Sequence, residues 1–122
     1  MMGREKRKYF RKYCKITVTM KRNGTKEVVT DGIRNISEGG IFVNTYNPLP
    51  VGSEIDLEFK IPEIDRVTKC RGSVMWGYYP DLLKDGMDLP GIGIEMLDIS
   101  PMDVGVISDF IVSSKEECHI AV

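Results

Sequence analysis

Two groups of polar residues in the N-terminal third of this 122-residue chain have the types and spacing to bind an anionic nucleotide. The first is Arg7-Lys8-Tyr9-Phe10-Arg11, in which two arginines lie four residues apart. The second is Asn35-Ile36-Ser37-Glu38-Gly39-Gly40, which combines an amide, a hydroxyl and two glycines. An arginine can form two parallel hydrogen bonds with a phosphate or with the O6/N7 edge of guanine, whereas lysine supplies only a point charge. The two groups together therefore predict a site for phosphate and guanine.

The second group predicts a row of polar side chains at the end of a strand. Asn35 and Ser37 are two residues apart, so on an extended strand their side chains share a face and can reach one ligand. The Asn35 amide oxygen can accept from guanine donors, and the Ser37 hydroxyl can donate or accept. Gly39 and Gly40 permit positive φ and remove side chains that would block close approach. An ordinary polar strand end entering a turn is the alternative.

Arg7 and Arg11 precede the first predicted strand, so we expect them on a flexible arm that orders around its ligand, with Arg4 as an additional cation. Ordering costs roughly 1–2 kcal/mol per residue. Several charge-assisted hydrogen bonds of about 1.5–3 kcal/mol each are needed to offset that cost. A solvated basic tail is the alternative.

Trp76 also has two interpretations. We favour packing in the core, and the alternative is stacking on guanine. Arg34 should point to the face opposite Asn35, as a surface residue.

Alternation of apolar and polar residues between Cys14 and Leu97 indicates β-strands rather than helices. Asn23-Gly24 is typical of a hairpin turn. Short links with no intervening helix favour an antiparallel barrel or sandwich. The six predicted strands are Cys14–Lys21, Lys26–Ile36, Gly40–Asn44, Glu54–Ile61, Val67–Tyr78 and Gly91–Leu97.

One helix should follow the strands. Ser100 is a good N-cap, Pro101 suits the first helical position, and Asp103 places an acidic group in the first turn. Apolar residues then recur at helical spacing, namely Ile107, Phe110 and Ile111. We expect this apolar stripe to cover one end or flank of the barrel; a partner-binding face is the less favoured interpretation. We thus expect a flexible basic arm over residues 1–13, a barrel with its helix over 14–113, and a tail over 114–122.

The charge distribution is uneven although the net charge is only −1. Between Arg4 and Lys15 there are seven cations and one anion, whereas the other residues contain 10 cations and 17 anions. A basic segment on an acidic body favours a compact anionic ligand over duplex nucleic acid. With 42% hydrophobic and 29% charged residues, the composition is that of one ordinary globular domain without a membrane span.

Cysteine and histidine usage argues against a metal site or a catalytic site. Cys14, Cys70 and Cys118 are widely spaced and form no Cys-x-x-Cys, and the single histidine, His119, lies near the end. We expect reduced thiols in a cytoplasmic protein, because the basic N-terminal segment leads into an alternating run rather than an apolar signal region. No nucleophile has a nearby base and no phosphate-binding glycine loop enters a helix, so we expect neither an enzyme nor a cofactor.

The order Arg-x-x-x-Arg followed by Asn-x-Ser-x-x-Gly resembles the signature of the PilZ domain, a bacterial receptor for the second messenger cyclic diguanylate (c-di-GMP). Gly72-Ser73-Val74-Met75-Trp76 and Gly91-Ile92-Gly93-Ile94-Glu95-Met96, followed by Ser100-Pro101, are similar to the later strands and the helix start of the family. The resemblance extends from about Glu5 to Val112, and the short chain looks like a stand-alone, single-domain member.

This resemblance implies an all-β fold, a six-stranded antiparallel barrel of the split-barrel type with one C-terminal helix. It also implies ligand-binding roles for Arg7, Arg11, Asn35, Ser37 and Gly40, to which Arg4, Gly39 and Trp76 are added as further candidates. Asn35 stands where Asp is more frequent in the family, which removes one charge from the site.

The resemblance further implies a switch that changes conformation on binding and regulates an unidentified downstream protein. In related proteins the outputs are motility, exopolysaccharide production, biofilm formation or virulence. One nucleotide or an intercalated pair could occupy the same site. Two alternatives remain, a nucleotide-independent protein-interaction module, as in some divergent relatives, and a barrel that binds single-stranded nucleic acid.

Overall fold

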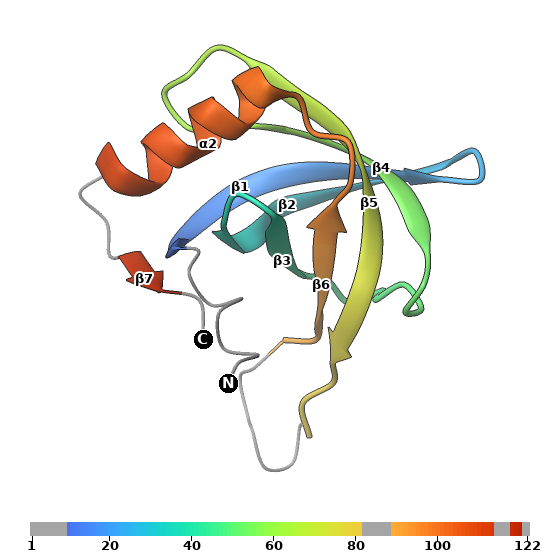
Figure 1. Cartoon of the computed structure of the whole chain (residues 1–122). Coiled ribbons are helices and arrows are strands. Elements are labelled where there is room, and N and C mark those ends of the chain that lie inside the picture. Colours follow the sequence, from blue (N-terminus) through green and yellow to red (C-terminus); the bar gives the residue numbers. More distant parts are fainter. Residues whose placement is uncertain (1–9, 82–88, 114–117, 121–122) are drawn as a thin grey trace, which may run out of the picture.

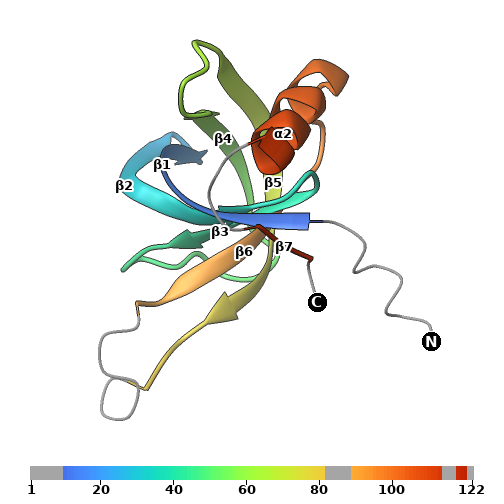
Figure 2. The same ribbon diagram turned by 90° about the vertical axis from the view of Figure 1, so that its left-hand side faces the viewer.

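Six antiparallel strands form a closed barrel in a computed structural model of the chain, which describes residues 10–81, 89–113 and 118–120 (Figure 1). Neighbours follow the order β2-β3-β6-β5-β4-β1, and β1 pairs again with β2 to close the ring. The helix α2 (Pro101–Ser113) lies at one end of the barrel, as the turned view also shows (Figure 2). The predicted barrel with one C-terminal helix is therefore confirmed. Its strands are β1 (Phe10–Arg22), β2 (Thr25–Ile36), β3 (Gly40–Asn44), β4 (Glu54–Lys60), β5 (Val67–Tyr78) and β6 (Gly91–Met96).

A tight hairpin turn sets the pairing of β1 with β2. Asn23 and Gly24 have φ values of 54° and 80°, and the flanking residues Arg22 and Thr25 are paired across the ladder. Positive φ at both central residues gives a turn whose twist matches that of the strands, and Asn-Gly is the pair that adopts it at least cost. The hairpin prediction is confirmed.

The first strand begins earlier than predicted, at Phe10 rather than at Cys14. Phe10 and Arg11 pair with β7 (Cys118–Ile120), and from Lys12 onward β1 also pairs with β2. Arg11 is thus a strand residue, and assigning residues 10–13 to a flexible arm was wrong. Residues 1–9 of that arm lie outside the described residues. β7 also places a strand within the segment that we expected to be a tail.

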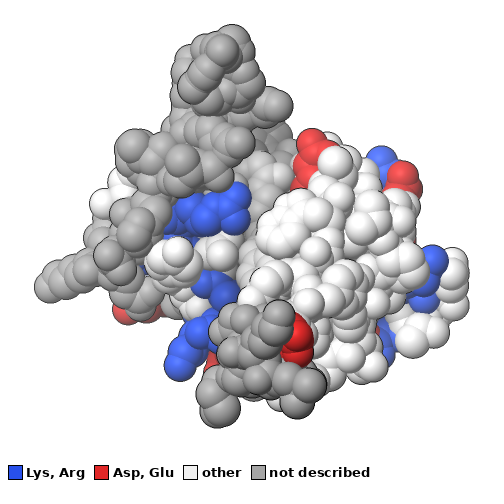
Figure 3. All heavy atoms as spheres, turned by 90° about the horizontal axis from the view of Figure 1, so that it is seen from below, with Lys and Arg blue, Asp and Glu red and all other residues white. Residues whose placement is uncertain are grey.

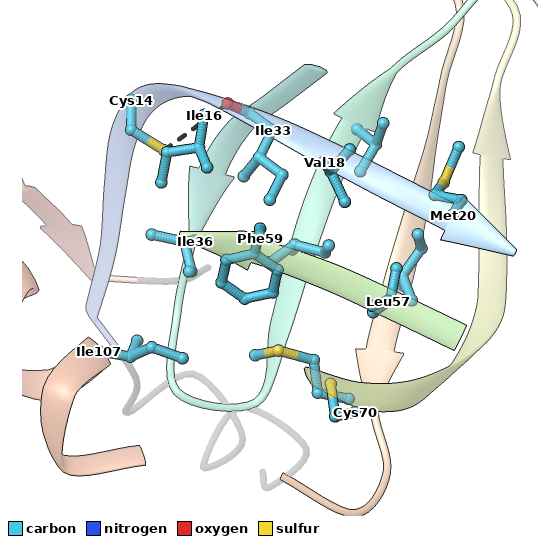
Figure 4. Close-up of a cluster of buried hydrophobic side chains, with 14 of the residues drawn as sticks. Cys14, Ile16, Val18, Met20, Ile33, Ile36, Leu57, Phe59, Cys70 and Ile107 are labelled. Atoms are coloured by element: carbon cyan, nitrogen blue, oxygen red, sulfur yellow. Dashed lines mark hydrogen bonds between the residues drawn. The ribbon is translucent and has the colours of Figure 1, made fainter. Parts of the chain in front are cut away.

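The barrel interior is filled by the inward-facing residues of the alternating strands, several of which are labelled in Figure 4. Val18, Ile33 and Ile36 are fully buried, and Ile107 brings α2 into the same cluster. The Cys14 thiol also points inward and donates to the Ile33 carbonyl oxygen at 3.7 Å (Figure 4). The apolar stripe of the helix therefore covers the core, as predicted.

Lys12 takes one of these inward positions. Its side chain is fully buried, and its Nζ lies 5.5 Å from the centre of the Phe110 ring of α2. Among the described residues Nζ has no hydrogen-bond partner. An ammonium group over an aromatic face is attracted by the ring quadrupole, by about 2 kcal/mol or more when water is excluded. Lys12 thus connects the start of β1 to the last turns of the helix.

A bulge in β2 changes the faces to which its residues point. The pairing with β3 shifts by one residue between Ile33 and Asn35, so two residues separate the buried Ile33 and Ile36. Arg34, predicted as a surface residue opposite Asn35, is only partly exposed, and its Nε is buried without a hydrogen-bond partner in the described part of the chain. An extra residue in one strand breaks the two-residue alternation on which that prediction relied.

A buried carboxylate anchors the start of α2. Asp103 donates its backbone N–H to Ser100 Oγ at 3.1 Å, which makes Ser100 the N-cap, and the Ser100 hydroxyl donates to Asp103 Oδ2 at 3.0 Å. Arg66 Nε and Thr68 Oγ1 donate to Asp103 Oδ1 at 2.7 and 3.3 Å. Burial opposes ionisation, but these hydrogen bonds and the Arg66 charge outweigh it, so the pKa of Asp103 lies below its usual range. The predicted cap is confirmed.

We predict that Asp103→Asn lowers the free energy of unfolding by about 2–3 kcal/mol, because Arg66 loses a charge-assisted hydrogen bond and the cap is weakened. Since the folded-state pKa is lowered, the wild-type advantage is fully present above the ordinary Asp pKa and is lost as pH falls through the lowered value. Urea unfolding of both proteins at neutral and acidic pH measures this difference.

Asp65→Asn is the matched control, since Asp65 pairs with Lys60 at 3.2 Å but its side chain is 99% exposed. An exposed pair of this kind contributes little to stability. Equal destabilisation by the two substitutions, or an Asp103 effect that does not change with pH, would contradict the assignment.

Candidate functional site

The β1–β2 ladder brings together the two polar groups identified in the sequence. Tyr13 is paired with Asn35 and Lys12 with Ile36, so Arg11 lies beside the residues that follow β2. Arg11 Nη1 donates to Asn35 Oδ1 at 2.7 Å, although 24 residues separate the two positions. The Asn35 oxygen that we expected to face a ligand therefore holds the guanidinium in place.

A short turn after β2 supplies the second side of the site. The Ser37 backbone N–H donates to the Gly40 carbonyl oxygen at 2.9 Å, and the Ser37 hydroxyl donates to the same oxygen at 3.4 Å. A Cβ at Gly40 would lie 2.8 Å from the Ile94 carbonyl oxygen, whereas one at Gly39 would meet nothing within 4 Å. Neither glycine has positive φ. Gly40 is thus required for the close approach of β3 to β6, and the positive φ that we expected is not used.

Arg11 and this turn border a groove of about 630 Å³ on the outside of the barrel. Gly93 and Ile94 of β6 contribute to its surface, and Val104 brings the first turns of α2 to its edge. The groove is lined by Arg11, Ser37, Glu38, Gly39, Gly40, Ile41, Met75, Trp76, Gly93, Ile94, Glu95 and Val104. It therefore contains a cation, a hydroxyl, an aromatic ring and exposed backbone, which is a combination suited to a nucleotide.

Trp76 lies on the outer face of the sheet, so our favoured reading of it as a core residue was wrong. It is 48% exposed, and the adjacent Met75 is 52% exposed. The pairing of β5 with β6 shifts by one residue between Val74 and Trp76, and this bulge turns outward a side chain that strict alternation would place inside. The change leaves part of the indole exposed along the groove.

Two glycines of β6 make room for the aromatic rings. A Cβ at Gly93 would lie 2.2 Å from Trp76 Cε2, and one at Gly91 would lie 2.3 Å from Phe42 Cζ. Phe42 and Trp76 are stacked, with ring centres 5.3 Å apart and an interplanar angle of 15°. The two rings thus stack on each other above β6, and this contact holds Trp76 in a fixed position at the edge of the groove.

A second hollow, of about 360 Å³, is a poorer candidate. Its charged side chains compensate one another, since Lys21 pairs with Glu58 at 3.9 Å and Arg71 with Asp98 at 3.2 Å. Burial, followed by the charges of Asp98 and Asp103, raises the pKa of its Cys70 thiol to about 11. The thiol is therefore protonated at neutral pH and is a weak nucleophile.

Lys and Arg side chains gather toward the left of the molecular face that Figure 3 shows from below. Arg4 and Arg7 lie outside the described residues, so their predicted roles stay predictions.

Our prediction did not include Met75, Glu38 or Glu95 as groove residues, although Glu38 lies within the second motif itself. Within the described residues, no three acidic, cysteine or histidine side chains could hold a metal ion, and no helix is long and apolar enough to cross a membrane.

The comparison that decides the family is a match of the PilZ domain sequence model to residues 5–113. The chain belongs to the PilZ domain family. Two solved structures show that this PilZ domain shares its fold with proteins of very different sequence. No curated protein sequence matches the chain significantly.

The first of these structures is the Bacillus subtilis inhibitor of motility MotI/DgrA, with a TM-score of 0.72 and 18% identity over 86% of this chain. The match spans 48% of that protein, so this PilZ domain corresponds to about half of its length. The second is the PilZ domain of YcgR from Escherichia coli with c-di-GMP, with a TM-score of 0.64 and 16% identity. The match covers 86% of this chain and 88% of the YcgR domain.

We predict that Gly93→Ala displaces Trp76, because the new methyl group would overlap the indole ring. The expected results are a shift of tryptophan emission to longer wavelength and a loss of roughly 1–3 kcal/mol of stability. Trp76 is the only tryptophan, so fluorescence during urea unfolding measures both.

Gly105→Ala in α2 is the control, since a Cβ there would meet nothing within 4 Å. It should leave the emission unchanged and add about 0.5–1 kcal/mol through helix propensity. Unchanged emission in Gly93→Ala would show that the ring does not rest on the glycine.

Proposed function

We propose that this PilZ domain is a receptor for c-di-GMP and that the ligand binds in the groove beside Arg11. The observation that carries the proposal is the hydrogen bond of 2.7 Å between Arg11 Nη1 and Asn35 Oδ1, which joins the two halves of the motif at the edge of the groove. Binding, rather than turnover, is the activity that we propose, with a change of conformation that alters affinity for a downstream protein.

The chemistry of the groove suits the two kinds of group in c-di-GMP. One edge of the Arg11 guanidinium is held by Asn35, which leaves further N–H groups for a phosphate or for the O6/N7 edge of a guanine. Ser37 offers a hydroxyl, and Gly39 and Gly40 leave backbone accessible beside it. The exposed part of the Trp76 ring suits a guanine, because a base stacked on an aromatic side chain gains about 1–3 kcal/mol.

We assign Arg7, with Arg4 as a further cation, to the same ligand from the N-terminal side. Both belong to the basic segment of the sequence, and two arginines are better matched than one to a ligand with two phosphates. Asn35 acts as a positioning residue for Arg11 in this proposal. Because Asn is neutral, it leaves the positive charge of Arg11 available to the ligand.

Known proteins support the proposal at the level of the family. The YcgR domain is described with c-di-GMP, and MotI/DgrA is described as an inhibitor of motility. We therefore propose a cytoplasmic signalling role with motility as an output, and exopolysaccharide or biofilm control as further outputs. The exposed Met75 and Tyr79, at 52% and 63%, favour one alternative, a protein-interaction module that needs no nucleotide.

We predict that Arg11→Ala weakens c-di-GMP binding by about 100-fold, because two charge-assisted hydrogen bonds of about 1.5 kcal/mol each are lost. The melting temperature should change little, since Arg11 is partly exposed and its described hydrogen bond is to a side chain. Isothermal titration calorimetry and thermal unfolding of wild type and variant measure the two quantities.

Lys15→Ala is the matched control, an exposed residue on the same strand whose removal makes the same change in charge. It should bind c-di-GMP nearly as the wild type does. Arg11→Lys keeps the charge but loses the planar fork, and should fall between the two. Absence of binding by the wild type would favour the interaction module, and equal binding by wild type and Arg11→Ala would reject the site.

A further inference from the structure

The groove contains two carboxylates that its proposed ligand does not obviously need. Glu38 and Glu95 line it together with Arg11. Within residues 10–81, 89–113 and 118–120, neither carboxylate forms a hydrogen bond or an ion pair, and the residues paired with Glu95 across the sheet are Gly40 and Ser73. A negative charge here repels a phosphate, so a groove for an anionic nucleotide would be better without it. Such a carboxylate is useful where the ligand presents hydrogen-bond donors.

Glu95 has a defined position relative to the aromatic platform. On β6 the residues Ile92, Ile94 and Met96 are buried in the core, so the alternate residues Gly91, Gly93 and Glu95 face outward. The Trp76 indole lies against Gly93. Two strand residues span about 6.6–6.8 Å, so Glu95 follows Gly93 at that distance on the outer face, and it lines the same groove as the indole. The small neighbours Gly40 and Ser73 leave it exposed.

Guanine carries donors on one edge and acceptors on another. Its Watson–Crick edge presents N1–H and the N2 amino group side by side, and an ionised carboxylate can accept from both with its two oxygens. Its O6 and N7 atoms are the acceptors that an arginine reads. Hypoxanthine lacks the N2 amino group, and adenine presents an acceptor at N1, so neither can make both bonds to a carboxylate.

We propose that Glu95 is a specificity-determining residue that accepts hydrogen bonds from N1–H and N2–H of a guanine stacked on Trp76. This inference rests on the proposed function, since it names how that same groove distinguishes guanine from other purines. Glu38 belongs to the turn after β2 and lies outside the outward-facing row that contains Gly93 and Glu95, so it does not share this role.

The test compares Glu95→Gln with wild type in calorimetric titrations with c-di-GMP and with its cyclic di-inosine analogue. Glutamine keeps one acceptor but places an N–H₂ group against a guanine donor. We expect c-di-GMP binding to weaken by about 10- to 100-fold, and the wild-type preference for guanine over hypoxanthine to fall close to one. Quenching of Trp76 emission by each ligand reports on stacking separately.

Glu38→Gln is the matched control, because it removes the same charge from the same groove. It should leave the ratio of the two affinities unchanged. Equal effects of the two substitutions would mean that the charge of the groove, and not recognition of the base, controls affinity, and would overturn the inference. Tighter c-di-GMP binding by Glu95→Gln would overturn it too. If the wild type binds c-di-GMP and Glu95→Gln keeps the same ratio of affinities for the two nucleotides, only this inference is rejected. If the wild type binds neither nucleotide, the proposed function is rejected, and this inference with it.

Discussion

The antiparallel ladder between β1 and β2 is the constraint on which both the barrel and the groove depend. It closes the ring of strands, and it places Arg11 next to Asn35 although 24 residues separate them. Near the hairpin its register is set by the Asn23-Gly24 turn, and two irregularities between Tyr13 and Val18 change the register before the strand reaches the site. The inward-facing row of β1, which includes Ile16 and Val18, holds the strand on the core. A slip by one residue would turn that row outward and point Arg11 into the core. The stability of the barrel and the geometry of the site therefore have the same origin.

The groove owes its shape as much to missing side chains as to those present. Gly91 and Gly93 leave space on the outer face of β6, and the stacked rings of Phe42 and Trp76 fill it. Gly40 allows β3 to approach the Ile94 carbonyl oxygen closely. Stacked rings and closely spaced strands restrict the movement of the side chains that border the groove. Rigidity favours a planar ligand, since little side-chain entropy is lost when the ligand stacks.

Much of this fold follows from local sequence signals. The hairpin, the helix cap at Ser100 and the six strands all follow from short patterns that the tertiary structure does not override. The errors come from interactions between distant segments. A bulge opposite Gly93 turned Trp76 outward, and pairing with β7 extended β1 to include Arg11. Glu95 was not recognised, because its place beside the indole depends on the register between β5 and β6.

Arg11 and Lys12 are adjacent in β1 but point to opposite sides of it. The first borders the groove, and the second is buried against Phe110 of the helix. One rigid stretch of backbone therefore carries both side chains. Any displacement of this stretch that draws the guanidinium outward also changes the fit of the amine against the aromatic ring. Adjacent residues of one strand thus contact the groove and the last turns of α2, so a shift of this stretch of β1 affects both places.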